Sequence, residues 1–121
     1  MIKHVSSGLV LDARSFEVQM QVPTRSKTQL WKQQTAGLGK FYLVNRANGK
    51  VLDINDEGKP NNKLITFPKH GGPNQQWFNN FGQLASDYKN VIIAAQDKDV
   101  KAVSNYGTSN EMFTFVLVCS K

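Results

Sequence analysis

Residues 75–77 read Gln-Gln-Trp and close the stretch HGGPNQQW, which begins at His70. Residues 29–31 read Gln-Leu-Trp, so a glutamine stands two places before a tryptophan twice in the chain. An altered copy, Glu-Met-Phe, occupies residues 111–113. Three copies of one pattern indicate an internal repeat, which constrains the fold more strongly than any local pattern.

Each copy closes a similar series of short apolar segments. The segments IKHVSSGLVLDARS from Ile2, YLVNRANGKVLDIND from Tyr42 and QLASDYKNVIIAAQD from Gln83 each place a polar turn with Gly or Asn between two apolar runs. This pattern predicts a β-hairpin. Further apolar stretches follow at 18–22, 63–67 and 100–103. A period of about 40 residues divides the chain into subdomains at about 1–40, 41–82 and 83–121.

The repeat predicts an all-β fold. No long window shows the apolar spacing of an amphipathic helix, whereas short alternating runs between Gly, Pro, Asn and Asp are frequent. A threefold repeat of short strands favours a closed barrel with pseudo-threefold symmetry, because closure removes the exposed sheet edges.

Composition limits the class of protein. The 121 residues suffice for one domain, and 40% apolar with 20% charged residues is typical of a globular chain. No apolar run approaches the roughly 20 residues that span a bilayer, so we expect no membrane insertion. The N-terminal residues lack the pattern of a secretory signal, and Cys119 is the lone cysteine. We therefore expect a cytoplasmic protein, or one released without a conventional signal peptide.

Charge and side-chain chemistry argue against several functions. The net charge is +6, but apart from a loose cluster at Arg25, Lys27 and Lys32 the basic residues are scattered, so no nucleic-acid partner is expected. His4 and His70 lie far apart without carboxylates at metal-ligand spacing, so no metal or other cofactor is expected. The sequence also lacks a nucleophile paired with a base, and we expect no enzyme.

The stretch YLVNRANGKVLDIND…LITFPKHGGPNQQW resembles one subdomain of the ricin B-type lectins, in which Gln-x-Trp occurs three times. The resemblance is strongest in residues 41–80, where it is closest to the mushroom-type members, and weakest in 83–121. It implies a β-trefoil fold and carbohydrate binding without catalysis, through a shallow pocket on each subdomain.

In the second subdomain the resemblance implies a complete site. An acid, a backbone amide, an aromatic ring and polar side chains before the tryptophan all have counterparts, and a turn histidine lies between them. The implied carbohydrate-binding residues are Asp56, Gly58, Ile65 (through its backbone), Phe67, His70, Asn74 and Gln75.

Sugar chemistry explains these residue types. A sugar ring has a C–H face that packs on an aromatic ring and hydroxyls that donate to a carboxylate. The implied ligands are galactose- or N-acetylgalactosamine-type glycans, bound with an affinity on the order of millimolar. One site per chain would gain avidity in a homodimer.

The other two subdomains match less well. In the first, Ser15, Val22 and Thr28 stand where the acid, the aromatic ring and the asparagine are expected. In the third, Asp97 and Asn110 suggest a weaker site, but Val103 replaces the aromatic ring and only Tyr106 is nearby.

Structural roles and other functions were weighed as well. We expect Trp31 and Trp77 to lie in the core, with each glutamine bonded to backbone. The alternative to a lectin is a β-trefoil protein-interaction module, such as a protease inhibitor or a cytoskeletal partner, with decayed sugar sites. A third alternative is salt-sensitive binding of sulfated glycans through the positive charge.

Overall fold

A computed structural model of the chain describes residues 1–55, 63–104 and 111–118. Within these ranges the chain forms short β-strands and three 3-10 helices, η1–η3. The strands are β1 (Ile2–His4), β2 (Val10–Asp12), β3 (Gln19–Gln21), β4 (Trp31–Gly37), β5 (Lys40–Asn45), β6 (Val51–Ile54), β7 (Leu64–Phe67), β8 (Phe78–Asn80), β9 (Gln83–Ser86), β10 (Val91–Gln96), β11 (Asp99–Ser104) and β12 (Phe113–Phe115), and the 3-10 helices are η1 (Lys27–Gln29), η2 (Pro73–Gln75) and η3 (Tyr88–Asn90).

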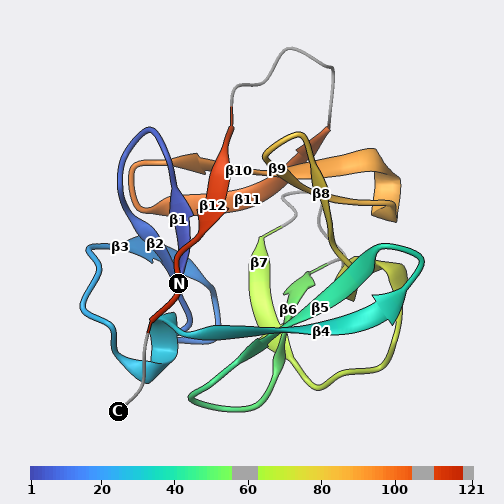
Figure 1. Cartoon of the computed structure of the whole chain (residues 1–121), viewed down its shortest axis with the longest axis horizontal. Helices are drawn as coiled ribbons and strands as arrows, with labels where there is room; N and C mark the ends of the chain where they lie inside the picture. Colours follow the sequence, from blue (N-terminus) through green and yellow to red (C-terminus); the bar gives the residue numbers. More distant parts are fainter. Residues whose placement is uncertain (56–62, 105–110, 119–121) are drawn as a thin grey trace.

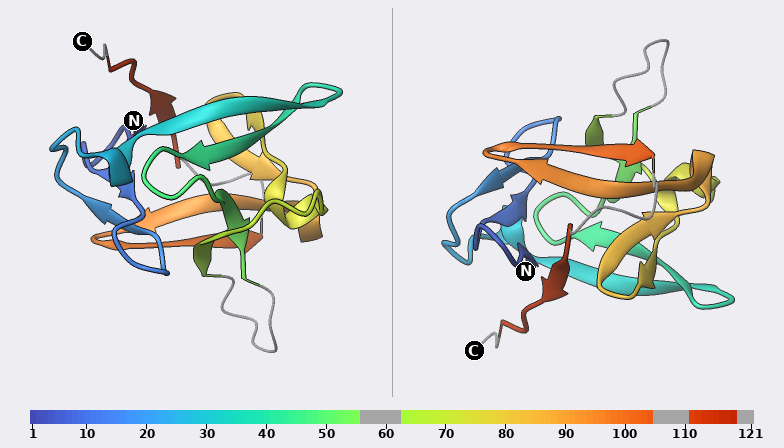
Figure 2. Two further views of the ribbon diagram at one scale, coloured as in Figure 1. Left: turned by 90° about the horizontal axis from the view of Figure 1, so that it is seen from below. Right: turned by 90° about the horizontal axis from the view of Figure 1, so that it is seen from above.

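The strands form three antiparallel four-stranded sheets, as the threefold repeat predicts. Their strand orders are β12-β1-β2-β3, β4-β5-β6-β7 and β11-β10-β9-β8. The predicted hairpins correspond to the pairs β1–β2, β5–β6 and β9–β10. The β4–β5 and β10–β11 hairpins lie on opposite sides of the molecule (Figures 1 and 2). The prediction of an all-β fold is confirmed.

Backbone hydrogen bonds join the sheets. Phe41 and Trp77 exchange two N–H···O bonds of 2.9 Å between the second and third sheets. The Val18 N–H donates to the Leu64 oxygen at 2.8 Å, which places the segment before β3 along β7. Strand β4 falls inside the predicted range 1–40 but pairs with β5, so the sheets do not coincide with the predicted subdomains.

One core lies between the three sheets. Corresponding apolar residues of the three repeats, among them Leu11, Leu52 and Ile93, are fully buried there. Trp77 is also fully buried, whereas Trp31 is partly buried and packs against the same cluster. Each buried Leu or Ile side chain contributes about 1.5–3 kcal/mol, so the repeat stabilises the fold through its apolar positions.

Candidate functional site

The Gln75 side chain occupies the centre of the second repeat. Its amide nitrogen donates to Asp53 Oδ2 at 2.8 Å and to the Pro68 carbonyl at 3.0 Å. Its oxygen accepts the N–H groups of His70 and Gly71 at 2.9 and 3.3 Å. The residue is fully buried. Gln75 therefore holds the 68–75 loop against β6.

Gln29 makes the same contacts in the first repeat. Its amide nitrogen donates to Asp12 Oδ2 at 3.0 Å and to the Val22 carbonyl at 2.9 Å, and its oxygen accepts two backbone N–H groups, those of Thr24 and Arg25. The tryptophans also correspond, since Trp31 Nε1 donates to the Leu11 carbonyl and Trp77 Nε1 to the Leu52 carbonyl, both at 3.1 Å. The glutamine and tryptophan of the repeat are thus architectural.

Asp12 is buried but ionised. Burial raises the pKa of Asp12, but nearby donors on Arg14, Gln29 and Thr28 and the charge of Arg14 outweigh burial and hold that pKa below its ordinary value. The Arg14 guanidinium lies 2.9 Å from Asp12 Oδ2. Asp12 Oδ1 is buried without a hydrogen bond, because the Thr28 hydroxyl, although close, does not meet hydrogen-bond geometry.

The second repeat shows what Asp12 Oδ1 lacks. The corresponding Asp53 Oδ1 accepts Asn74 Nδ2 at 3.0 Å, and Thr28 stands at the place of Asn74, one residue before the glutamine. We predict that Thr28→Asn raises the free energy of unfolding by about 1 kcal/mol, because the longer side chain can donate to this buried oxygen. Urea denaturation tests this prediction. Thr28→Ser lengthens nothing and is expected to bring no gain, and equal stability of all three proteins would contradict the assignment.

The third repeat departs from the other two. Ala94 stands in β10 where Asp12 and Asp53 stand in β2 and β6, and Glu111 replaces the glutamine. Glu111 Oε2 lies 2.6 Å from His4 Nε2, while His4 Nδ1 lies 2.8 Å from Ser7 Oγ. A side chain from β1 therefore occupies part of the role that the Asp–Gln pair has elsewhere.

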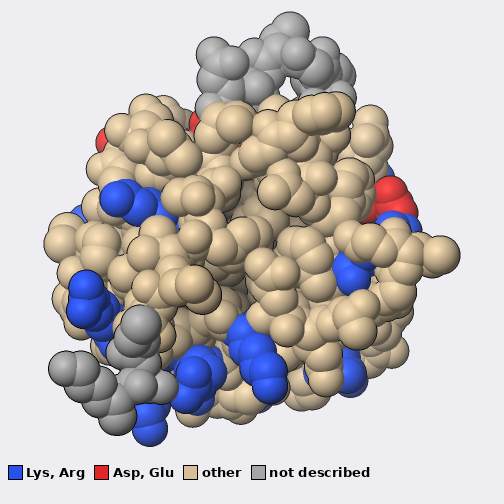
Figure 3. Space-filling model, viewed as in Figure 1, with Lys and Arg blue, Asp and Glu red and all other residues tan. Residues whose placement is uncertain are grey.

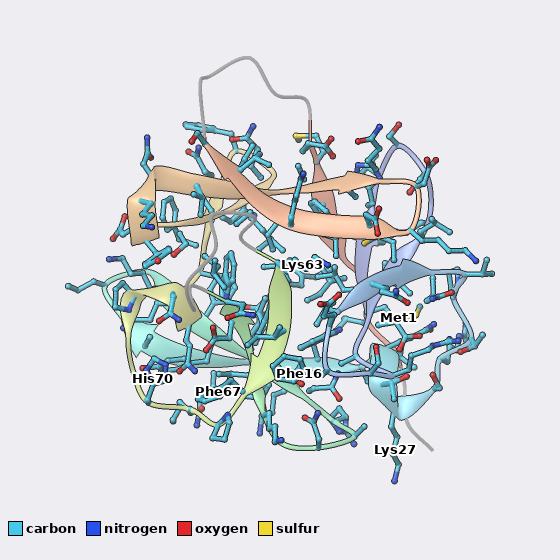
Figure 4. All side chains as sticks on the ribbon, turned by 180° about the vertical axis from the view of Figure 1, so that it is seen from behind. Met1, Phe16, Lys27, Lys63, Phe67 and His70 are labelled. Atoms are coloured by element: carbon cyan, nitrogen blue, oxygen red, sulfur yellow. The ribbon has the colours of Figure 1, made fainter. Side chains whose placement is uncertain are left out.

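The candidate sugar site lies at the end of β7. The Phe67 side chain is 39% exposed and meets the His70 ring edge-on, with 6.1 Å between the ring centroids. His70 Nδ1 accepts the Gly72 N–H at 3.0 Å, which leaves Nε2 toward Asp53 Oδ2, 3.7 Å away. Both rings lie beside the lower end of β7 in Figure 4. The site thus offers an accessible aromatic ring next to polar groups.

The remaining implied residues differ in accessibility. Asn74 is 9% exposed and donates to Asp53 Oδ1 and to the Ile54 carbonyl. The Ile65 side chain is buried, and its backbone pairs with Asp53 on one side and bridges to Glu17 on the other. Ile65 and Gln75 therefore lie beneath the surface that a ligand would touch. Asp56 and Gly58 lie outside the described residues.

The register corrects one residue of the first subdomain. Val51 pairs with Phe67 in the second sheet, and the corresponding Val10 pairs with Gln21, not with Val22. The Val22 carbonyl accepts the Gln29 amide, which is the role of Pro68 in the second repeat. The prediction that Val22 replaces the aromatic ring was wrong by one residue, and Gln21 stands there.

Asp97 and Asn110 receive no common site in the third subdomain. Asp97 is exposed in the turn between β10 and β11, with a φ of 54°. Val103, paired with Ile92, stands where Phe67 stands in the second subdomain, so the ring is absent as predicted. Asn110 and Tyr106 lie outside the described residues.

Other ligand chemistry has less to build on. In the described ranges, no group of three or more His, Cys, Asp or Glu side chains could hold a metal ion. None of the described helices has the length and apolar character needed to cross a membrane. Lys and Arg side chains form separate spots on the face seen in Figure 3, most of them toward its lower edge.

Sequence reasoning missed two features. The role of Asp53 as the acceptor for both Asn74 and Gln75 depends on a contact across more than 20 residues, although the paired Leu-Asp and Gln-x-Trp motifs signalled it. The contact between His4 and Glu111 joins the two ends of the chain and left no signal in the sequence.

Known proteins resemble the chain in sequence and in structure. The family described as ricin-type β-trefoil lectin domain-like matches residues 1–67 and 27–114. No curated protein matches the chain in sequence.

Three solved structures illustrate the likeness in fold. The designed threefold-symmetric protein ThreeFoil has a TM-score of 0.84 at 23% identity, over 97% of this chain and 96% of that one. A β-trefoil lectin of the Vibrio vulnificus hemolysin/cytolysin, solved with N-acetyl-D-lactosamine bound, has a TM-score of 0.81 at 16% identity, over 99% of this chain and 94% of that one. An exo-β-1,3-galactanase from Clostridium thermocellum has a TM-score of 0.77 at 26% identity, and the match covers 97% of this chain but 29% of the enzyme. The fold is therefore a β-trefoil, as predicted.

Proposed function

Because the chain belongs to the family of ricin-type β-trefoil lectin-like domains, we propose that it binds galactose- or N-acetylgalactosamine-type glycans through its second subdomain, without catalysis. Membership of this family supports carbohydrate binding in general. The type of sugar and the subdomain rest on the residues at the end of β7.

Phe67 is the observation that carries the choice of subdomain. Its ring is accessible beside His70, whereas the corresponding positions hold Gln21 in the first subdomain and Val103 in the third. Only an aromatic ring offers a flat apolar face for the C–H side of a sugar. Asn74 lies beneath the same surface, and Asp56 would supply the carboxylate that accepts two adjacent hydroxyls.

Two similar structures support a galactose-type ligand. The Vibrio vulnificus lectin is described with N-acetyl-D-lactosamine, a disaccharide that contains galactose, and the Clostridium thermocellum enzyme as a galactanase. A single shallow site with one phenyl ring would bind a monosaccharide with a dissociation constant on the order of 1 mM. A homodimer, which would present two such sites, would raise the avidity for a branched glycan.

We predict that the chain is retained on galactose-agarose and eluted by free galactose, and that Phe67→Ala and Asp56→Ala lose this retention. Isothermal titration should show the affinity for galactose falling at least about tenfold in each variant. Phe81→Ala is the matched control, since Phe81 is 95% exposed in the turn after β8. Unchanged affinity in Phe67→Ala would rule out the proposed site.

The same experiment separates the alternatives. A protein-interaction module would flow through the column and capture a specific protein instead. Binding of sulfated glycans through net charge would collapse as salt is raised, whereas binding of a neutral sugar would change little.

A further inference from the structure

A cavity of about 440 Å³ lies in the third subdomain, apart from the site at Phe67. Its walls are the face of the β10–β11 hairpin, the segment 17–19 of the first subdomain, Lys63 and Glu111. This volume falls within the range of cavities that hold small ligands. The cavity does not include Asp97, on which the weaker third site was predicted.

Small side chains in the third repeat leave this space open. Ala94, which lines the cavity, pairs with Lys101, whereas the corresponding Asp53 pairs with Ile65. Val103 lines the wall where Phe67 stands in the second subdomain. No aromatic ring is among the residues that line the cavity, so a sugar would not be held here by stacking.

Two lysines face each other at the edge of the cavity. Lys63 and Lys101 are opposite each other across an antiparallel bridge, an arrangement in which like charges repel. Figure 4 shows Lys63 at the start of β7. Lys63 Nζ lies 3.3 Å from a Glu17 carboxylate oxygen, whereas Lys101 has no ion-pair partner in the described part of the chain. An anion bound beside Lys101 would relieve this repulsion.

Hydrogen-bond acceptors lie on the other walls. The Glu111 carboxylate is fixed by His4 Nε2 at 2.6 Å, and Glu17 is paired with Lys63. Asp99 is exposed at the start of β11 and has no ion-pair partner among the described residues. After this internal pairing the cavity keeps one free cation, Lys101, and one free carboxylate, which can accept hydroxyl groups.

We propose that this cavity binds an acidic sugar, whose carboxylate pairs with Lys101 and Lys63 and whose hydroxyls donate to Asp99 and Glu111. A sugar acid satisfies both free charges, since its carboxylate meets the cation and its hydroxyls meet the carboxylate. A neutral sugar leaves the lysine pair unrelieved, and a plain anion leaves Asp99 beside a like charge. The site is independent of Phe67 and differs from it in ligand class.

Titration of the ¹⁵N-labelled chain with D-glucuronate, and in parallel with D-glucose, tests the proposal. Glucuronate should shift the amide signals of Ala94, Ala95 and Lys101, and glucose should not. Lys101→Gln should weaken glucuronate binding about fivefold or more, because it removes a charge-assisted contact. Lys98→Gln, an exposed lysine of the same hairpin outside the cavity, should leave the affinity unchanged.

The outcomes distinguish the two sites. Absence of shifts at Ala94, Ala95 and Lys101, or equal glucuronate affinity in Lys101→Gln and the parent chain, would overturn the proposal. Galactose titration of the same sample reports on Phe67 separately. Lys63→Gln provides a second variant, also at an exposed position, and should weaken glucuronate binding while leaving galactose binding intact.

Discussion

Replacing Gln75 with alanine is expected to lower the free energy of unfolding by about 3 kcal/mol, a large fraction of the stability of a domain of this size. The side chain is fully buried and makes four hydrogen bonds, to Asp53, to the Pro68 carbonyl and to two backbone N–H groups. Alanine leaves these partners without hydrogen bonds in a space from which water is excluded. Urea denaturation monitored by tryptophan fluorescence measures the effect.

The neighbouring glutamine provides the control. Gln76 Nε2 donates to the Gly71 carbonyl at 2.9 Å in an exposed contact, so Gln76→Ala should cost about 0.5 kcal/mol. The two substitutions remove the same side chain from adjacent positions, and they differ in burial and in the number of partners. If both variants unfold at the same urea concentration, the architectural role of Gln75 is wrong.

Trp77→Ala is expected to be the most damaging substitution, with a loss of about 3–5 kcal/mol. Trp77 is fully buried in the core between the sheets, and its Nε1–H donates to the Leu52 carbonyl at 3.1 Å. Alanine removes the ring from the core and the donor from a buried oxygen. Thermal unfolding measures the loss.

Trp31 gives the comparison, because it has the same place in the first repeat but is only partly buried. Trp31→Ala should therefore cost clearly less than Trp77→Ala. If Trp77→Ala does not fold, Trp77→Phe keeps most of the ring and should cost about 1–2 kcal/mol through the lost hydrogen bond. A larger loss at Trp31 than at Trp77 would contradict the burial described here.

The sequence predicted the fold because the repeat is written in apolar and turn residues. The three hairpins and the buried Leu11, Leu52 and Trp77 follow from short-range patterns that each repeat states separately. Sheet membership was less predictable, since β4 pairs with β5 across a turn at Gly37–Lys40 that the repeat boundary had divided. Pairing depends on contacts between repeats, which a local pattern does not contain.

The candidate site was only partly predictable. Spacing placed Phe67, His70 and Asn74 near one another, and the rings of Phe67 and His70 do meet. Burial was not predictable from residue type, since Gln75 is polar and yet fully enclosed. The Val22 prediction was wrong by one residue because strand register shifts every side chain at once, and register is fixed by pairing with β2.

The central claim is that the second subdomain binds a galactose-type glycan at Phe67. Titrating the ¹⁵N-labelled chain with N-acetylgalactosamine, and following each backbone amide, tests it most directly. The account predicts saturable shifts centred on Phe67, His70 and Asn74, with a dissociation constant on the order of 1 mM, and their loss in Phe67→Ala. Saturable shifts confined to other parts of the chain, or no shift at any residue at tens of millimolar sugar, would contradict it.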